Sequence, residues 1–171
     1  NEKIIKILEN NLLKKDIELN EKYKHKIKLF VNWLKNSDFQ NKKNSILAVE
    51  KNFAWKVGDI FVRGTVDRID KIGENEYIII DYKTSEKVNE FEKDTDFDLT
   101  MNIYKHAVEE IFGLNIKGLK LIYPLCDKEI SIKTEYKEFI KNKILKIVKK
   151  IEKNDKNCKI CYKKNLRTLQ I

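Results

Sequence analysis

An apolar run that ends abruptly in charged residues constrains this fold more than any other feature of the chain. Residues 76–84 read EYIIIDYKT, so three isoleucines are followed at once by Asp81 and, two residues later, by Lys83. A continuous run of this kind is typical of a strand that is buried on both faces. Such a strand predicts a layered fold in which other elements cover both sides of a sheet.

Two segments upstream also have the composition of strands. Residues 46–56 (ILAVEKNFAWK) and 59–70 (DIFVRGTVDRID) are rich in β-branched and aromatic side chains. Short turns, at 57–59 and 72–75, join them to each other and to the apolar run. We therefore expect the three strands to form an antiparallel meander.

Helical patterns surround this meander. The N-terminal third carries an apolar stripe at helical spacing, formed by Tyr23, Ile27, Phe30 and Leu34. Further helices are expected at 97–112 and 139–151, and two strands between them at 117–124 and 128–135. The order of helices, three strands, helix, two strands and helix predicts an α/β fold. Its mixed central sheet would have about five strands, flanked by helices.

The chain is expected to form one domain. Its 171 residues are enough to bury a core, and five glycines and one proline leave little room for a flexible linker. We divide it into a helical N-terminal part (1–45), a catalytic core (46–136), and a C-terminal helix and tail (137–171). Because the first residue is asparagine and not methionine, we expect the sequence to be part of a longer protein.

The charge balance favours a polyanionic partner. The formal net charge is +9, from 36 Lys and Arg against 27 Asp and Glu, which favours nucleic acid; a lysine-rich proteome is the alternative. No apolar run approaches the roughly 20 residues that a membrane span needs, and the N-terminus does not have the pattern of a signal peptide. Three cysteines are too few for a secreted disulfide framework. We expect a cytoplasmic protein without a membrane partner.

The candidate site lies where the apolar run turns polar. Residues two apart on a strand face the same side, so Asp81 and Lys83 are expected to share a site from which Tyr82 points away. Antiparallel pairing can set Asp67 beside Asp81, and Glu50 on the neighbouring strand can reach the same pocket. Three carboxylates would repel one another without a cation, so this grouping predicts a metal.

Phosphodiester cleavage is a reaction that this set of residues can perform. Mg²⁺ or Mn²⁺ takes oxygen ligands, which Asp67, Asp81 and the backbone carbonyl of Tyr82 can supply. Lys83 could orient the attacking water or counter the developing charge. Arg63 and Arg68 lie near enough in sequence to contact phosphates. The alternatives are an ordinary D-x-K pair on a strand and a surface ion pair between Asp67 and Arg68.

The order of these motifs resembles a known family. Glu50, then GTVDRID (64–70), then IIIDYKT (78–84) are similar to the motif series of the RecB-like branch of the PD-(D/E)XK nuclease superfamily. That branch includes RecB- and AddB-type nuclease domains and CRISPR-associated exonucleases. The resemblance implies a restriction-endonuclease-like core. It assigns Glu50 to the first acidic motif, the metal ligand of the second motif to Asp67, and the D-x-K of the third motif to Asp81 and Lys83.

Three further elements of the family are matched only in part. The helical Q-x-x-x-Y element keeps Tyr104 but has Thr100 in place of glutamine; Tyr104 would contact the lysine or the nucleic-acid backbone, or would be a half-buried core residue. Many relatives bear a metal-binding histidine on an N-terminal helix, where this chain offers only His25 between two lysines. The Cys158–Cys161 pair resembles part of the four-cysteine set of iron–sulfur relatives, but two ligands cannot close a cluster site. We therefore expect no iron–sulfur cluster in this chain.

The resemblance and the residues together predict a metal-dependent DNA nuclease that uses Mg²⁺ or Mn²⁺. We expect an exonuclease acting on DNA ends or single strands in repair, recombination or CRISPR-related processing, with a helicase fused upstream or acting in trans. The alternative is a catalytically inactive nucleic-acid-binding module of the same fold.

Overall fold

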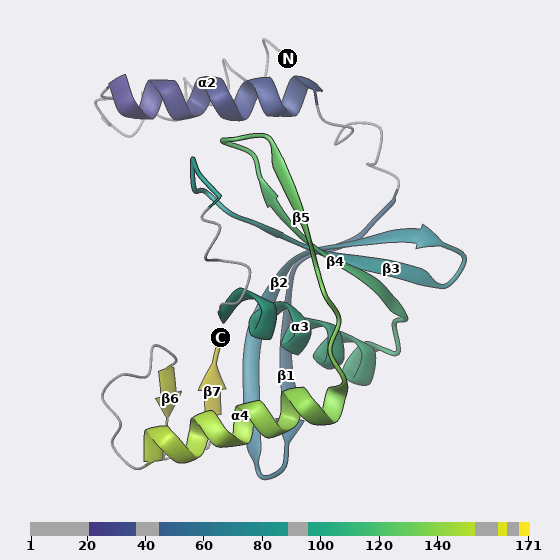
Figure 1. Ribbon diagram of the computed structural model, residues 1–171. Coiled ribbons are helices and arrows are strands. Elements are labelled where there is room, and N and C mark those ends of the chain that lie inside the picture. Colours follow the sequence, from purple (N-terminus) through teal and green to yellow (C-terminus); the bar gives the residue numbers. More distant parts are fainter. Residues whose placement is uncertain (1–20, 37–44, 89–95, 153–160, 164–167) are drawn as a thin grey trace.

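The computed structural model describes residues 21–36, 45–88, 96–152, 161–163 and 168–171 of the chain (Figure 1). These residues form three helices and seven strands. In chain order they are α2 (Glu21–Asn36), β1 (Ile46–Val57), β2 (Ile60–Gly73), β3 (Glu76–Tyr82), α3 (Asp96–Phe112), β4 (Ile116–Tyr123), β5 (Lys128–Ile132), α4 (Lys137–Glu152), β6 (Cys161–Lys163) and β7 (Thr168–Gln170).

The strands form one mixed sheet in the order β5-β4-β3-β2-β7-β6, with β1 paired to β2. β1, β2 and β3 pair antiparallel, as the short turns predicted. β3 and β4 pair parallel, and α3 makes the crossover connection that parallel pairing requires. The predicted α/β class, mixed sheet and order of the elements from α2 to α4 are therefore confirmed.

The two short C-terminal strands were not predicted. The segment 137–171 was expected to hold only a helix and a tail, but β7 pairs parallel to the first half of β2, and β6 pairs antiparallel to β7. Strands of three residues are too short to show an alternating pattern. The partner of β7 on β2 is about a hundred residues away in the sequence, so only the folded chain brings these two strands together.

Helices cover the sheet on both faces, as the apolar run at 76–84 predicted. α3 and α4 lie on one face and α2 on the other (Figure 1). Ile79 packs in the large core cluster with side chains of α3 and α4, whereas its neighbour Ile80 packs with Trp33 of α2 and Ile122 of β4. Successive residues of β3 are therefore buried on opposite faces. No helix in the described part of the chain is long and apolar enough to span a membrane.

A substitution at Gly64 is expected to disturb the core beneath the site. A Cβ atom at this position would lie 2.8 Å from the ring of Phe53, which is buried and packs edge-on against Tyr104 with ring centroids 5.7 Å apart. We expect Gly64→Ala to lower the free energy of unfolding by about 1–3 kcal/mol, as overpacking does, in a denaturant titration. Gly73→Ala is the control, because its Cβ would meet only the exposed Glu76 side chain. Equal stability of the two variants would contradict the prediction.

Candidate active site

Asp81 and Lys83 form an ion pair at the end of β3. The ammonium nitrogen of Lys83 lies 2.6 Å from Oδ2 of Asp81, and the same nitrogen lies 4.3 Å from the ring centroid of Phe97 on α3. The Asp81 side chain is buried, and its Oδ2, although close to Lys83, has no well-aligned hydrogen bond in the described structure. Burial raises the pKa of Asp81; the charge of Lys83 opposes this shift and the charge of Asp67 adds to it. Asp81 is therefore a carboxylate whose charged form is disfavoured by burial and stabilised by Lys83.

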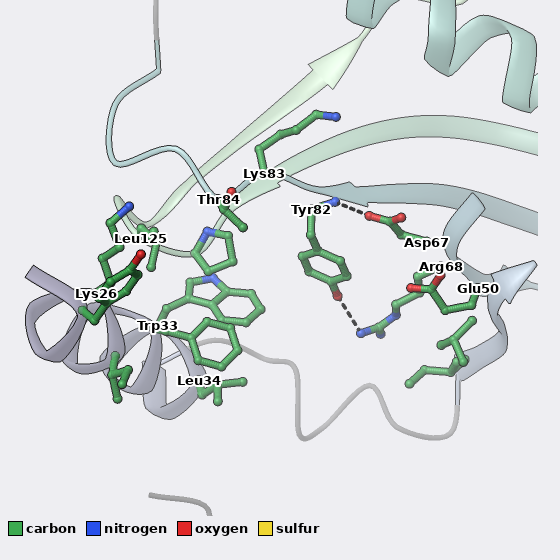
Figure 2. Close-up of a pocket in the computed structure, with 16 residues that line it drawn as sticks. Lys26, Trp33, Leu34, Glu50, Asp67, Arg68, Tyr82, Lys83, Thr84 and Leu125 are labelled. Carbon is green, nitrogen blue, oxygen red and sulfur yellow. Dashed lines mark hydrogen bonds between the residues drawn. The ribbon is translucent and has the colours of Figure 1, made fainter. Parts of the chain in front are cut away.

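Asp67 lies beside this pair. The β2–β3 ladder ends at Arg68 and Ile80, and the same antiparallel register continued by one residue places Asp67 opposite Asp81. Oδ2 of Asp67 accepts a hydrogen bond of 2.9 Å from the backbone N–H of Tyr82 (Figure 2). This bond joins the two strands where the regular ladder stops. It also holds the Asp67 carboxylate close enough to Asp81 for the two charges to interact.

Glu50 has a strained backbone opposite Asp67. Its φ is +49°, a left-handed conformation that costs a non-glycine residue about 1–3 kcal/mol. Its neighbours Val49 and Lys51 pair with Arg68 and Val66 of β2. Side chains of a regular strand point alternately to its two faces, so residues three apart point to opposite faces. Val66 and Ile69 of β2 are three apart but pack in the same core cluster, so the alternation of β2 is interrupted between them. A strained carboxylate residue thus marks the point where β2 turns its side chains towards the candidate site.

The side chain of Glu50 is exposed and lines the same groove as Asp67. The expected convergence of three carboxylates is not seen: among the described residues, no three His, Cys, Asp or Glu side chains are grouped so that they could hold a metal ion. Two carboxylates, Asp67 and Asp81, are brought together instead. Mg²⁺ is commonly held by one or two carboxylates, with waters and substrate phosphates as its other ligands, so this donor set fits a hard divalent cation.

Tyr104 of α3 is close to both carboxylates. Its side chain is buried, and burial together with the charges of Asp81 and Asp67 raises its pKa to about 12. The hydroxyl therefore stays protonated at neutral pH and can donate a hydrogen bond. Thr100, which occupies the glutamine position of the family element, lies one turn earlier on α3 and is partly buried.

Arg68 belongs to a buried hydrogen-bond network with Asp70 and Tyr82, on the face of the sheet that α2 covers. Its guanidinium donates two hydrogen bonds of 2.6 Å to the two carboxylate oxygens of Asp70. A third, of 3.1 Å, goes to the hydroxyl of Tyr82 (Figure 2). Arg68 and Asp70 are only 3% and 2% exposed. The sequence suggested that Arg68 contacts DNA or pairs with Asp67 at the surface. The structure instead gives it Asp70 as partner and buries it.

The remaining candidates lie apart from these carboxylates or outside the described residues. Arg63 is exposed on β2, four residues before Asp67, and its carbonyl accepts the N–H of Ile171. His25 is exposed on α2. Cys158 lies outside the described residues, and only the backbone of Cys161, in β6, is described. Phe97 was not singled out from the sequence, because a lone aromatic residue at the start of a helix carries no signal of its contact with Lys83.

A groove of about 770 Å³ opens between α2 and the part of the sheet that carries Asp67. Figure 2 shows that the ring of Tyr82 extends towards α2, whereas the Lys83 side chain extends away from it. The groove is lined by the predicted apolar stripe of α2 and, at its other end, by Glu50 and Asp67; Lys83 also borders it, but its ammonium points away. The stripe was visible in the sequence, but the groove was not.

A model of the PD-(D/E)XK nuclease superfamily matches residues 2–161. The chain belongs to this superfamily. The match covers nearly the whole sequence and agrees with the mixed sheet, so the predicted superfamily is confirmed; membership of its RecB-like branch stays a prediction. No protein of curated function matches the sequence.

Solved structures with the same architecture include a "Putative exonuclease" from Eubacterium rectale. It superposes with a TM-score of 0.57 at 11% identity, over 83% of this chain and 60% of that one. A protein named SSO0001 gives a TM-score of 0.46 at 19% identity, over 77% of this chain and 59% of its own. At 11% identity, the similarity to the structure from Eubacterium rectale shows a shared fold and nothing more. This PD-(D/E)XK chain spans about 60% of the length of these two structures.

Proposed function

We propose that this domain hydrolyses phosphodiester bonds in DNA with the help of Mg²⁺ or Mn²⁺. One observation carries the proposal: Asp67, in the middle of β2, lies beside Asp81 at the end of the antiparallel β3, with the ammonium of Lys83 2.6 Å from Asp81. The excess charge of two adjacent carboxylates, one of them buried, favours a bound cation. The lysine supplies a positive side chain that a reacting phosphate would meet beside them.

In this proposal, Asp67, Asp81 and the carbonyl of Tyr82 would hold the cation, which when bound would supply activation of a water and neutralisation of charge on the phosphate. The N–H of Tyr82 orients Asp67 through the 2.9 Å hydrogen bond. Asp81 and the ring of Phe97 hold the Lys83 ammonium, which positions the attacking water and stabilises charge that develops on the phosphoryl oxygens. Tyr104 donates a hydrogen bond near the two carboxylates, and the exposed Glu50 binds a water or a second cation at the rim.

Two observations bear on the mode of cleavage and on its biological setting. A formal charge of +9 favours sequence-independent binding to phosphates, and one structural neighbour is described as an exonuclease. We propose exonuclease action on DNA ends or single strands, in repair, recombination or CRISPR-related processing, within a larger protein or beside a helicase.

A second candidate is a nucleic-acid-binding module that has lost catalysis. Two observations favour it: Thr100 replaces the glutamine of the family element, and His25, the one histidine of α2, is exposed. The close Asp67, Asp81 and Lys83 cluster opposes it, because an inactive domain has no chemical need for two adjacent carboxylates.

Cleavage of end-labelled single- and double-stranded DNA in Mg²⁺, Mn²⁺ or EDTA tests the proposal. We expect wild type to cut only with metal, and Lys83→Met to cut about 10²-fold more slowly, as loss of a general acid–base or charge-stabilising group does. Lys117→Met is the matched control, because Lys117 is exposed at the opposite end of the β3–β4 pair. Salt-sensitive DNA binding without any cutting would instead support the binding module.

A further inference from the structure

The groove beneath α2 has a chemical character that phosphodiester hydrolysis alone does not require. It is almost entirely apolar, and its α2 wall includes Tyr23, Phe30 and Trp33. To bind a cation and a phosphate, the protein would need only the end of the groove that carries Glu50 and Asp67. A volume of about 770 Å³ with mostly apolar walls is in the range of sites for organic ligands.

Aromatic rings follow one another along this groove. The rings of Phe30 and Trp33 are stacked, with centroids 5.8 Å apart at an interplanar angle of 30°. Trp33 meets Tyr82 edge-on with centroids 6.2 Å apart, and Tyr82 is next to the candidate catalytic residues Asp81 and Lys83. Tyr23, one turn before Ile27, is 54% exposed at the open end. The aromatic surface therefore leads away from the point where the phosphate would be cut.

The helix that forms one wall of the groove is basic. α2 contains five lysines and one histidine in 16 residues, and Lys22, Lys24, Lys28 and Lys35 are exposed on it. Lys26 lines the groove itself, where its ammonium lies 3.1 Å from Glu86. Apolar aromatic rings on a helix that carries five lysines match a single nucleic-acid strand, whose flat bases are apolar and whose backbone is anionic.

We propose that this groove binds the unpaired bases of a single-stranded nucleic acid next to the phosphodiester that is cleaved. The bases stack on Phe30 and its neighbouring rings, and the phosphates lie along the lysines of α2. A base in a duplex is paired and stacked on both faces, so it cannot enter the groove without being extruded. The site thus selects single strands or frayed ends, and this inference rests on the proposed function.

Binding of two end-labelled 12-mers to the full chain in EDTA tests the inference by fluorescence anisotropy. One strand is oligothymidine and the other has abasic sites throughout. We expect the base-containing strand to bind at least about 5-fold more tightly, the lower end of the contribution of one stacked base. Phe30→Leu, which keeps an apolar side chain at a partly buried position, should remove this preference without changing the affinity for the abasic strand.

Two further variants separate stacking from a general loss of structure. Phe30→Trp should keep the preference, and Tyr136→Leu, which removes an 86% exposed tyrosine outside the groove, should leave both affinities unchanged. Circular dichroism of each variant reports whether α2 is still folded. Equal affinity of wild type for the two strands would overturn the inference, as would a preference that survives Phe30→Leu.

Hydrolysis of bis(p-nitrophenyl) phosphate with Mn²⁺ distinguishes this inference from the proposed function. This small diester has no nucleobases and does not need the groove. If wild type hydrolyses it but binds both strands equally, the groove inference fails and the nuclease proposal stands. If hydrolysis is absent but the base preference is present and depends on Phe30, the groove binds bases and the nuclease proposal fails.

Discussion

Asp81→Asn is expected to slow metal-dependent DNA cleavage about 10³-fold. The substitution removes a carboxylate that we propose as a cation ligand and as the partner that holds Lys83. Loss of one preorganised electrostatic group commonly costs about 10²–10³-fold in rate, and loss of a metal ligand adds to this. The rate should be measured under single-turnover conditions with saturating Mg²⁺ or Mn²⁺, together with Mn²⁺ binding by calorimetry, which should weaken in parallel.

The same variant is expected to be no less stable than wild type at pH 7. Burial raises the pKa of Asp81 above its ordinary value of 3.8, so the folded protein holds this proton more tightly than the unfolded chain. The carboxyl therefore favours folding when it is neutral, and this contribution is lost as the pH rises through its folded-state pKa. The neutral amide of the Asp81→Asn variant avoids that loss. The advantage of the variant in thermal melting should disappear below about pH 3.8, where both states of wild type are protonated.

Glu74→Gln is the control for this prediction, because Glu74 is an exposed carboxylate in the turn between β2 and β3. It should change neither rate nor stability. If Asp81→Asn cleaves DNA at a rate within a few-fold of wild type, Asp81 is not a metal ligand. If it is markedly less stable at pH 7, the raised pKa does not describe the folded protein.

Asp70→Ala is expected to give the largest loss of stability of any single change discussed. It leaves the buried Arg68 guanidinium without the carboxylate that accepts two of its hydrogen bonds. Breaking a buried ion pair by removing one partner costs about 3–5 kcal/mol. For a chain of this size, that corresponds to a fall in melting temperature of about 6–20 °C. Differential scanning calorimetry at pH 7 would measure it directly.

A double variant tests whether the cost comes from the charge left behind. Arg68→Met combined with Asp70→Leu removes both charges and fills much of the same space, and such replacements of buried pairs are often neutral. We expect it to regain most of the stability that Asp70→Ala loses. Glu21→Ala, which breaks an exposed ion pair with Lys24, should have the same melting temperature as wild type. A double variant less stable than Asp70→Ala would show that the hydrogen bond from Arg68 to Tyr82 is the larger contribution.

Much of the framework could be predicted because it depends on local patterns. The meander followed from strand composition and short turns, and α3 and α4 followed from apolar residues repeating at helical spacing. The pairing of Asp67 with Asp81 followed from an antiparallel register set by a turn of a few residues. Contacts of this kind close short loops, so the residues that make them are near one another in the sequence.

The parts that could not be predicted depend on contacts between distant segments. β7 pairs with β2 from about a hundred residues away, and Phe97 meets Lys83 only because α3 packs against the sheet. Arg68 could have paired with either neighbouring aspartate. The change of phase in β2 and the packing of α2 decide that it is buried with Asp70 and Tyr82.

By itself, the sequence determined the α/β class, the order of the elements and the pairing of two strands that brings Asp67 beside Asp81, because period-two and helical patterns specify which faces are buried. Only the tertiary structure decided that two carboxylates and not three come together among the described residues, and that an aromatic groove opens beside them. These outcomes depend on strand twist, on the strained backbone of Glu50 and on the docking of α2, which are properties of the packed chain and not of any local pattern.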